Sequence, residues 1–68
     1  MNLVVIRKEK GYTQKRLAKE SNVNLKTIQS YENGFKNINK ASGEILYKLA
    51  VTLRVPIEDL LEEKETII

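Results

Sequence analysis

Residues 13–34 hold the side chains whose chemistry is most informative in this chain of 68 residues. Cationic and hydrogen-bonding groups lie between the apolar positions of this stretch, namely Lys15, Arg16, Lys19, Lys26, Gln29 and Ser30. Such groups bind phosphate oxygens by charge and meet base edges by hydrogen bonds. If the fold gathers them on one surface, that surface suits DNA.

Two short helices joined by a polar break are expected to gather these groups. Apolar residues fall at helical spacings on both sides of residues 21–24, and they are Leu17, Ala18, Ile28 and Tyr31. Where two helices cross steeply through so short a break, a small side chain is needed at their closest approach, and Ala18 supplies it. The pattern predicts a helix-turn-helix with Val23 as the buried pivot of the turn.

Capping residues mark the ends of the expected helices. A first helix covers residues 2–10 and ends at the following glycine, because glycine accepts the left-handed backbone that closes a helix. Thr13 and Asn24 precede the two helices of the helix-turn-helix, where their side chains can accept a free backbone N–H. Asn33 and Gly34 close the third helix, since both residues tolerate a left-handed backbone.

A basic, amide-rich loop over residues 35–40 follows, and Ile38 is its expected anchor to the core. A fourth helix starts at either Asn39 or Ser42, because each residue can cap it. Residues 55–61 form a short fifth helix with a proline in its first turn, where the missing N–H costs nothing. No strand pattern occurs, so the sequence predicts one all-α domain.

Charge is distributed unevenly along the chain. The net charge is +3, but residues 1–40 carry nine Lys and Arg against three Glu, whereas residues 41–68 carry three against six acidic residues. A basic front half and an acidic back half would orient the domain in the field of a polyanion. At this length the chain forms one small domain, whose stability depends on good packing or on a partner.

Several classes of function are disfavoured by the composition. The chain has no Cys and no His, so disulfides, thiol chemistry and the usual zinc ligand sets are excluded. No nucleophile and base are placed to work together, so we expect no enzyme activity, cofactor or metal. No apolar run is long enough to span a membrane, and the first residues have the wrong order for a signal peptide. A cytoplasmic protein is expected.

One ordered set of motifs spans about residues 3–63. The set consists of Ile6-Arg7, Gly11-Tyr12-Thr13-Gln14, Leu17-Ala18, Val23, Ile28, Tyr31-Glu32-Asn33-Gly34, Leu46-Tyr47-Lys48-Leu49-Ala50 and Ile57-Glu58-Asp59-Leu60-Leu61. In order and spacing the set resembles the Cro and phage-repressor family, also called lambda-repressor-like or XRE. The resemblance implies a compact five-helix DNA-binding domain over residues 1–63, with the helix-turn-helix at helices 2 and 3, and residues 64–68 as a frayed tail.

The resemblance also assigns roles by position. The base-contact candidates, on the exposed side of the third helix, are Leu25, Lys26, Thr27, Gln29 and Ser30. The phosphate-contact candidates are Thr13, Gln14, Asn24, Asn33, Lys36, Asn37 and Lys40. Arg7 and Glu32 match a pair that in relatives forms an ion bridge between the first and third helices. The alternative for this pair is a solvated charge on each helix.

The sequence differs from the family pattern at three informative positions. Asn22 replaces the usual glycine of the turn, and Asn visits the left-handed region more easily than most residues. Arg16 stands where relatives often carry Glu, so a capping box is lost and a cation facing phosphate is expected instead. Leu25 stands where many members place a polar reader of bases.

The resemblance predicts a sequence-specific regulator of transcription that binds double-stranded DNA. It would act as a repressor, with the third helix in the major groove and two copies on a palindromic operator. The alternative is a protein-interaction module, such as an antitoxin or adaptor, that meets its partner through Val4, Val5 or an apolar tail ending in Ile67 and Ile68. The two functions can coexist in one protein.

Overall fold

The computed structural model describes residues 2–62, and within that range every regular element is helical. The α-helices are α1 (Asn2–Glu9), α2 (Gln14–Ser21), α3 (Leu25–Glu32), α4 (Gly43–Leu53) and α5 (Ile57–Leu60), and a 3-10 turn, η1 (Ile38–Lys40), precedes α4. This confirms the predicted all-α, five-helix domain. The predicted frayed tail at residues 64–68 lies outside the described residues.

The two helices of the helix-turn-helix begin at the expected caps. Thr13 Oγ1 accepts the backbone N–H of Arg16 at 3.0 Å, and Asn24 Oδ1 accepts that of Lys26 at 2.8 Å. Each bond satisfies an N–H that has no acceptor within its own helix. Asn22, in the turn, adopts the left-handed conformation with φ 60°, which asparagine tolerates better than most residues.

Some helix ends differ from the sequence prediction. α1 ends at Glu9 and α5 covers only Ile57–Leu60, so both are shorter than expected. Gly34 is left-handed with φ +83°, but Asn33 is not, because its φ is −89°. One left-handed residue is enough to turn the chain away at the end of α3.

Ser42, and not Asn39, caps α4. Ser42 Oγ accepts the backbone N–H of Ile45 at 3.2 Å. Asn39 instead holds the backbone of Glu62 by two hydrogen bonds, from Nδ2 to the carbonyl and from the N–H to Oδ1, each 2.8 Å long. Pro56 takes the N-cap position of α5, one residue before the first turn predicted for it.

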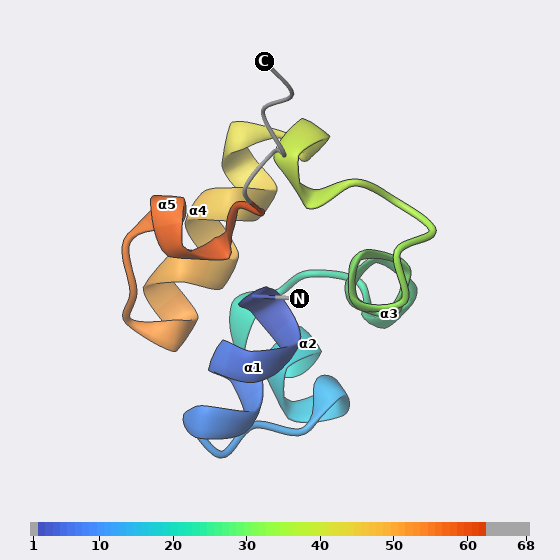
Figure 1. Ribbon diagram of the computed structural model, residues 1–68. Helices are drawn as coiled ribbons and strands as arrows, with labels where there is room; N and C mark the ends of the chain where they lie inside the picture. The colour runs from blue at the N-terminus through green and yellow to red at the C-terminus, as the bar shows by residue number, and fades with distance from the viewer. Residues whose placement is uncertain (1, 63–68) are drawn as a thin grey trace.

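One hydrophobic core joins all of these elements. Its buried members are Leu3, Leu17, Val23, Ile28, Tyr31, Ile38, Leu46, Leu49, Ala50, Leu53 and Leu60. Val23 is buried as the pivot of the turn, Ile38 anchors the loop after α3, and Ala18 packs against the core. α2 packs against both α3 and α4, and α1 packs against α3 and α5. Figure 1 shows α3 on one side of the molecule, with α4 and α5 on the other.

Candidate nucleic-acid interface

A buried ion pair joins the first and third helices. The Arg7 guanidinium donates from Nε to Glu32 Oε2 at 2.6 Å and from Nη2 to Glu32 Oε1 at 3.0 Å. Only 10% of the Arg7 side chain and 6% of the Glu32 side chain are exposed. In this two-bond geometry the guanidinium and the carboxylate neutralise each other's charge and form hydrogen bonds that water would otherwise provide. The burial does not fit the alternative of two solvated charges.

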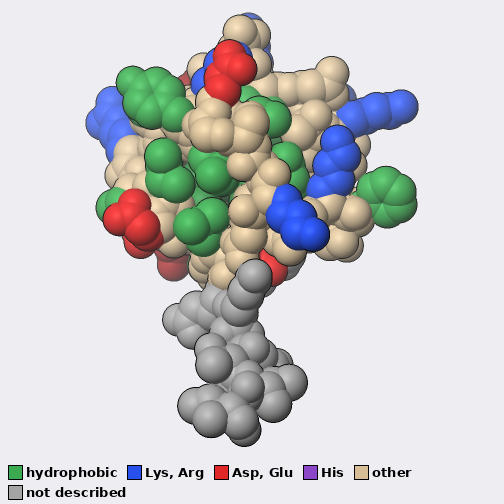
Figure 2. Space-filling model, turned by 90° about the horizontal axis from the view of Figure 1, so that it is seen from above, with side chains coloured by type: hydrophobic (Ala, Val, Ile, Leu, Met, Phe, Trp, Pro, Cys, Tyr) green, Lys and Arg blue, Asp and Glu red, His purple; other side chains and the backbone are tan. Residues whose placement is uncertain are grey.

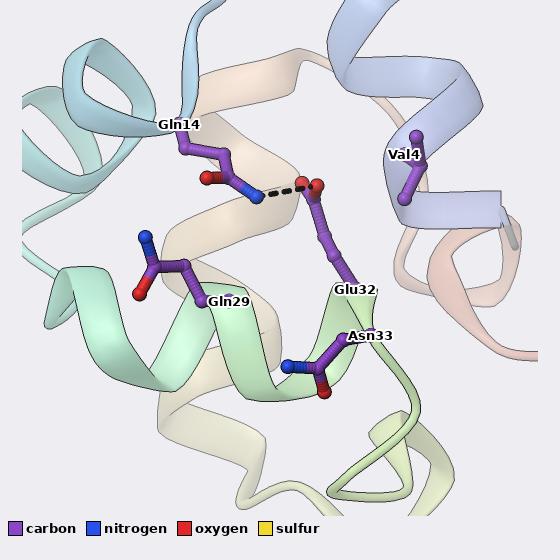
Figure 3. A pocket seen from close by; sticks show the side chains of 5 residues that line it. All are labelled: Val4, Gln14, Gln29, Glu32 and Asn33. Carbon is purple, nitrogen blue, oxygen red and sulfur yellow. Dashed lines mark hydrogen bonds between the residues drawn. The ribbon is translucent and has the colours of Figure 1, made fainter.

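Gln14 brings the start of α2 to the same carboxylate. Its Nε2 donates to Glu32 Oε1 at 2.9 Å, which Figure 3 shows as a dashed line. Arg7 also donates from Nη1 to the Tyr12 carbonyl at 2.8 Å, just before α2. We call Arg7, Gln14 and Glu32 the Arg7 cluster. The cluster fixes the end of α3 relative to α1 and to the N-terminus of α2.

The outer side of α3 carries two well-exposed base-contact candidates. Ile28 and Tyr31 turn into the core, and the exposed Lys26 and Gln29 lie on the other side of the helix. The remaining candidates, Leu25, Thr27 and Ser30, are half-buried. Lys26 and Gln29 are therefore the most exposed of the five candidates.

Three asparagines beside α3 and in the loop after it share one arrangement. The Oδ1 atoms of Asn24, Asn33 and Asn37 each accept the backbone N–H two residues later, at 2.8, 2.8 and 3.0 Å. Because the oxygen is used in this way, the amide nitrogen of each exposed side chain is left to donate. Phosphate oxygens are acceptors only, so this arrangement suits them.

The loop after α3 adds two cations. Lys36 and Lys40 are both exposed, on a loop that Ile38 fastens to the core. The Lys36 N–H donates to the Ser30 carbonyl at 3.0 Å, so the loop leaves α3 in a defined direction.

Thr13 differs from the other phosphate-contact candidates, because its hydroxyl is used to cap α2. A contribution at Thr13 would come from the free backbone N–H groups that begin that helix.

An open groove of about 390 Å³ lies beside α3. It is lined by Val4, Gln14, Gln29, Glu32 and Asn33. In Figure 3, Gln14 reaches from the start of α2 toward Glu32, Gln29 stands on α3, Asn33 follows the end of that helix, and Val4 stands on α1. Val4, a partner contact under the alternative function drawn from the sequence, is the apolar residue among the five that line this groove.

Arg16 departs from the expectation of a cation that faces phosphate. Its Nε donates to Glu20 Oε2 at 2.7 Å, and its guanidinium carbon lies 4.5 Å from the centre of the Tyr12 ring. The Tyr12 hydroxyl donates to Glu20 Oε1 at 3.0 Å. We call Tyr12, Arg16 and Glu20 the Arg16 cluster. Sequence reasoning missed it, although the spacing of four residues between Arg16 and Glu20 is the usual spacing of a helical ion pair.

Hydrogen bonding within the Arg16 cluster shifts the pKa values of two groups. The hydrogen bond to Glu20 raises the pKa of Arg16. Hydrogen bonds from Arg16, and then from Tyr12, lower the pKa of Glu20. Both side chains are therefore held in their charged forms, with the cation directed to a carboxylate of its own helix.

Neither a metal site nor a membrane-spanning helix is found within residues 2–62. Among these residues, no three His, Cys, Asp or Glu side chains are grouped so as to hold a metal ion. No helix in the described part of the chain is long and apolar enough to cross a membrane. The chemistry that the structure gathers beside α3 is that of cations and hydrogen-bonding amides.

A comparison with protein families shows that α2 and α3, which carry these cations and amides, lie within a known helix-turn-helix domain. A family model described as Helix-turn-helix matches residues 5–60, a range that includes α2, α3 and the turn between them. No curated protein and no solved structure matches the chain. The family model covers well over half of the 68 residues. The chain therefore belongs to the lambda-repressor-like, or XRE, helix-turn-helix family of DNA-binding regulators.

Proposed function

We propose that this protein is a sequence-specific repressor of transcription that places α3 in the major groove of double-stranded DNA. The observation that carries the proposal is the exposure of Lys26 and Gln29 on the outer side of α3. The Arg7 cluster holds this helix in place through Glu32, its last residue. A reading helix must be both accessible and rigidly positioned, because base contacts depend on a fixed register. No catalytic step is part of the proposal.

Base reading falls mainly to the two exposed side chains of α3. Lys26 donates to the O6 and N7 acceptors of guanine, and Gln29 pairs with adenine through its amide. Thr27 and Ser30 add hydroxyl contacts closer to the helix axis, and Leu25 packs against a thymine methyl group. The half-burial of these three supports a smaller share in recognition.

Phosphate contacts surround the reading helix and set its register. Asn24 and Asn33 stand at the two ends of α3, and each has an amide nitrogen left to donate. Asn37, Lys36 and Lys40 extend the same chemistry along the following loop. Gln14 has a double role, because its amide nitrogen braces Glu32 while the start of its helix offers backbone N–H groups to phosphate.

Two copies of the chain would bind a palindromic operator. A single α3 of eight residues reaches only a few base pairs, and two copies one helical turn apart double the sequence that is read. Repression then follows from occupancy, since a dimer on the operator excludes other proteins from the same DNA. The acidic back half of the chain, residues 41–68, is expected to face away from the DNA.

Selection of bound sequences from a random duplex pool tests the proposal. We expect the wild type to enrich a palindrome, and Lys26→Ala or Gln29→Ala to alter the preferred bases at defined positions. Lys36→Ala should weaken binding to all sequences alike and reduce the salt slope of log K by about one. Lys10→Ala is the matched control, because Lys10 lies in a separate hollow with Thr52 and Arg54.

Two outcomes would contradict the proposal. Unchanged preferences in the Lys26 and Gln29 variants would remove α3 as the reader. If no motif is enriched at all, the protein-interaction module becomes the better assignment. Val5 favours that second function, because it is a large apolar residue that stays exposed on α1.

A further inference from the structure

The outer side of α4 carries a short row of side chains that the core does not use. Glu44, Tyr47, Val51 and Arg54 are exposed, and Tyr47 and Val51 keep 63% and 56% of their surface in water. Spacings of three and four residues place Glu44, Tyr47 and Val51 along one side of the helix, away from its buried residues, and Arg54 follows as the left-handed residue that caps the C-terminal end. We call these four residues the α4 row.

The α4 row is arranged so that it complements itself. Tyr47 and Val51 form its centre, with Glu44 three residues before Tyr47 at the N-terminal end of α4 and Arg54 three residues after Val51 at the C-terminal end. If two copies of α4 lie antiparallel about a two-fold axis, Tyr47 faces the partner's Val51 and Glu44 faces the partner's Arg54. A parallel pair would set each charge against its like. The row thus fits a second copy in one orientation.

We infer that a second copy of this chain binds the α4 row through an antiparallel contact between the two α4 helices. The inference rests on the homodimer proposed above and gives it a surface. Figure 2 shows hydrophobic side chains gathered on the left of the view, the side on which Figure 1 places α4 and α5, while several Lys and Arg side chains stand on the right, toward α3. Pairing through α4 leaves the candidate DNA-contacting residues free.

The contact between the two copies is small and therefore weak. It joins two apolar side chains of each copy and two oppositely charged pairs at the ends. Glu44 is also 3.4 Å from Lys48 of its own helix, and this bond competes with the contact to the partner. Interfaces of less than about 1,200 Å² are typical of transient association, so we expect a dissociation constant on the order of 0.1 mM.

Charge exchange in the absence of DNA tests the inference. Glu44→Arg and Arg54→Glu each turn both end contacts of a homodimer into like-charge contacts. Sedimentation equilibrium should show the dissociation constant of each variant raised by about tenfold. In an equimolar mixture of the two variants, opposite charges meet at both ends of the heterodimer. Its dissociation constant should return to within about threefold of the wild-type value.

Matched controls separate the α4 row from charge in general. Glu9→Arg and Lys8→Glu make the same charge changes at exposed positions near the end of α1 and should leave association unchanged, alone or mixed. Val51→Lys places a charge at the centre of the row without disturbing the core and should leave the chain monomeric. Circular dichroism confirms that each variant is folded.

Three results would overturn the inference. They are a wild type that stays monomeric up to about 1 mM, a Val51→Lys variant that associates like the wild type, and a mixture of the two charge variants that remains monomeric. Binding of each variant to a duplex with a single half-site is measured separately. It reports DNA contacts without pairing, so failure of the α4 contact is distinguishable from failure of the proposed DNA function.

Discussion

The two Arg–Glu clusters of this domain have nearly the same bond length and very different surroundings. Arg7 and Glu32 lie 2.6 Å apart with 10% and 6% of their side chains exposed. Arg16 and Glu20 lie 2.7 Å apart with 57% and 41% exposed. Distance alone would rank the pairs as equal. Burial separates them, because a charge taken out of water depends on its partner and a solvated charge does not.

The two clusters also differ in what they connect. The Arg7 cluster joins three helices, and its ion pair links residues 25 positions apart in the sequence, so it positions α3. The Arg16 pair joins residues one helical turn apart in α2, and within residues 2–62 its side chains form a hydrogen bond outside that helix only with Tyr12. We therefore expect the first to contribute to folding and DNA reading, and the second to act locally on one side chain.

Loss of the buried carboxylate should give the largest effect. Glu32→Gln keeps the shape of the side chain but leaves the Arg7 guanidinium nearly buried without a counter-charge. The free energy of unfolding should fall by about 1 to 3 kcal/mol. Urea unfolding at neutral pH, followed by circular dichroism, measures this loss.

Glu20→Gln is the matched control for that substitution. It makes the same chemical change in the exposed pair, and water can replace the lost contact, so its effect should be clearly smaller. Equal losses in the two variants would show that burial does not distinguish the clusters. A Glu32→Gln variant as stable as the wild type would give the Arg7 cluster no part in folding.

Removal of one hydrogen bond from each cluster should give a second, smaller contrast. Gln14→Ala removes one donor to Glu32 but leaves the ion pair in place, and should cost about 1 kcal/mol. Tyr12→Phe removes one donor to Glu20 and keeps the ring beneath Arg16, so the change should be slighter. Gln14→Ala should also weaken DNA binding, because the start of α2 is no longer held to the end of α3. If Tyr12→Phe were the more destabilising of the two, hydrogen bonds in the buried cluster would not contribute more to stability than those in the exposed cluster.

Local signals in the sequence were sufficient to predict most of the helix ends. Thr13 and Asn24 cap the helices predicted for them, and Gly34 closes α3, because each effect depends only on neighbours in the chain. Asn39 was one of two candidate caps for α4. It instead binds the backbone of Glu62, 23 residues away, and no local pattern predicts that contact.

The candidate site was predictable in part, for a similar reason. Arg7 and Glu32 are 25 residues apart, so their spacing carries no signal, and only the family resemblance suggested that they meet. Lys26 and Gln29 followed from helical periodicity, which places them away from the side of α3 that buries Ile28 and Tyr31. Arg16 was assigned to phosphate from its position alone, and its ion pair with the acidic residue four positions later was not predicted.

The smallest predicted effect concerns the pH dependence of the exposed cluster. Hydrogen bonds from Arg16 and Tyr12 lower the pKa of Glu20 below its ordinary value of 4.5, so the folded state favours the carboxylate. Such a group adds stability above its unfolded pKa, and the contribution is lost as the pH falls through the folded pKa. Urea midpoints of the wild type and Glu20→Gln should therefore differ slightly at pH 7 and converge as the pH falls below the ordinary pKa of 4.5 and through the lowered pKa of the folded state. A difference that persisted at low pH would mean that Glu20 acts through packing or neutral hydrogen bonds, and the contrast with the Arg7 cluster would then not be one of charge.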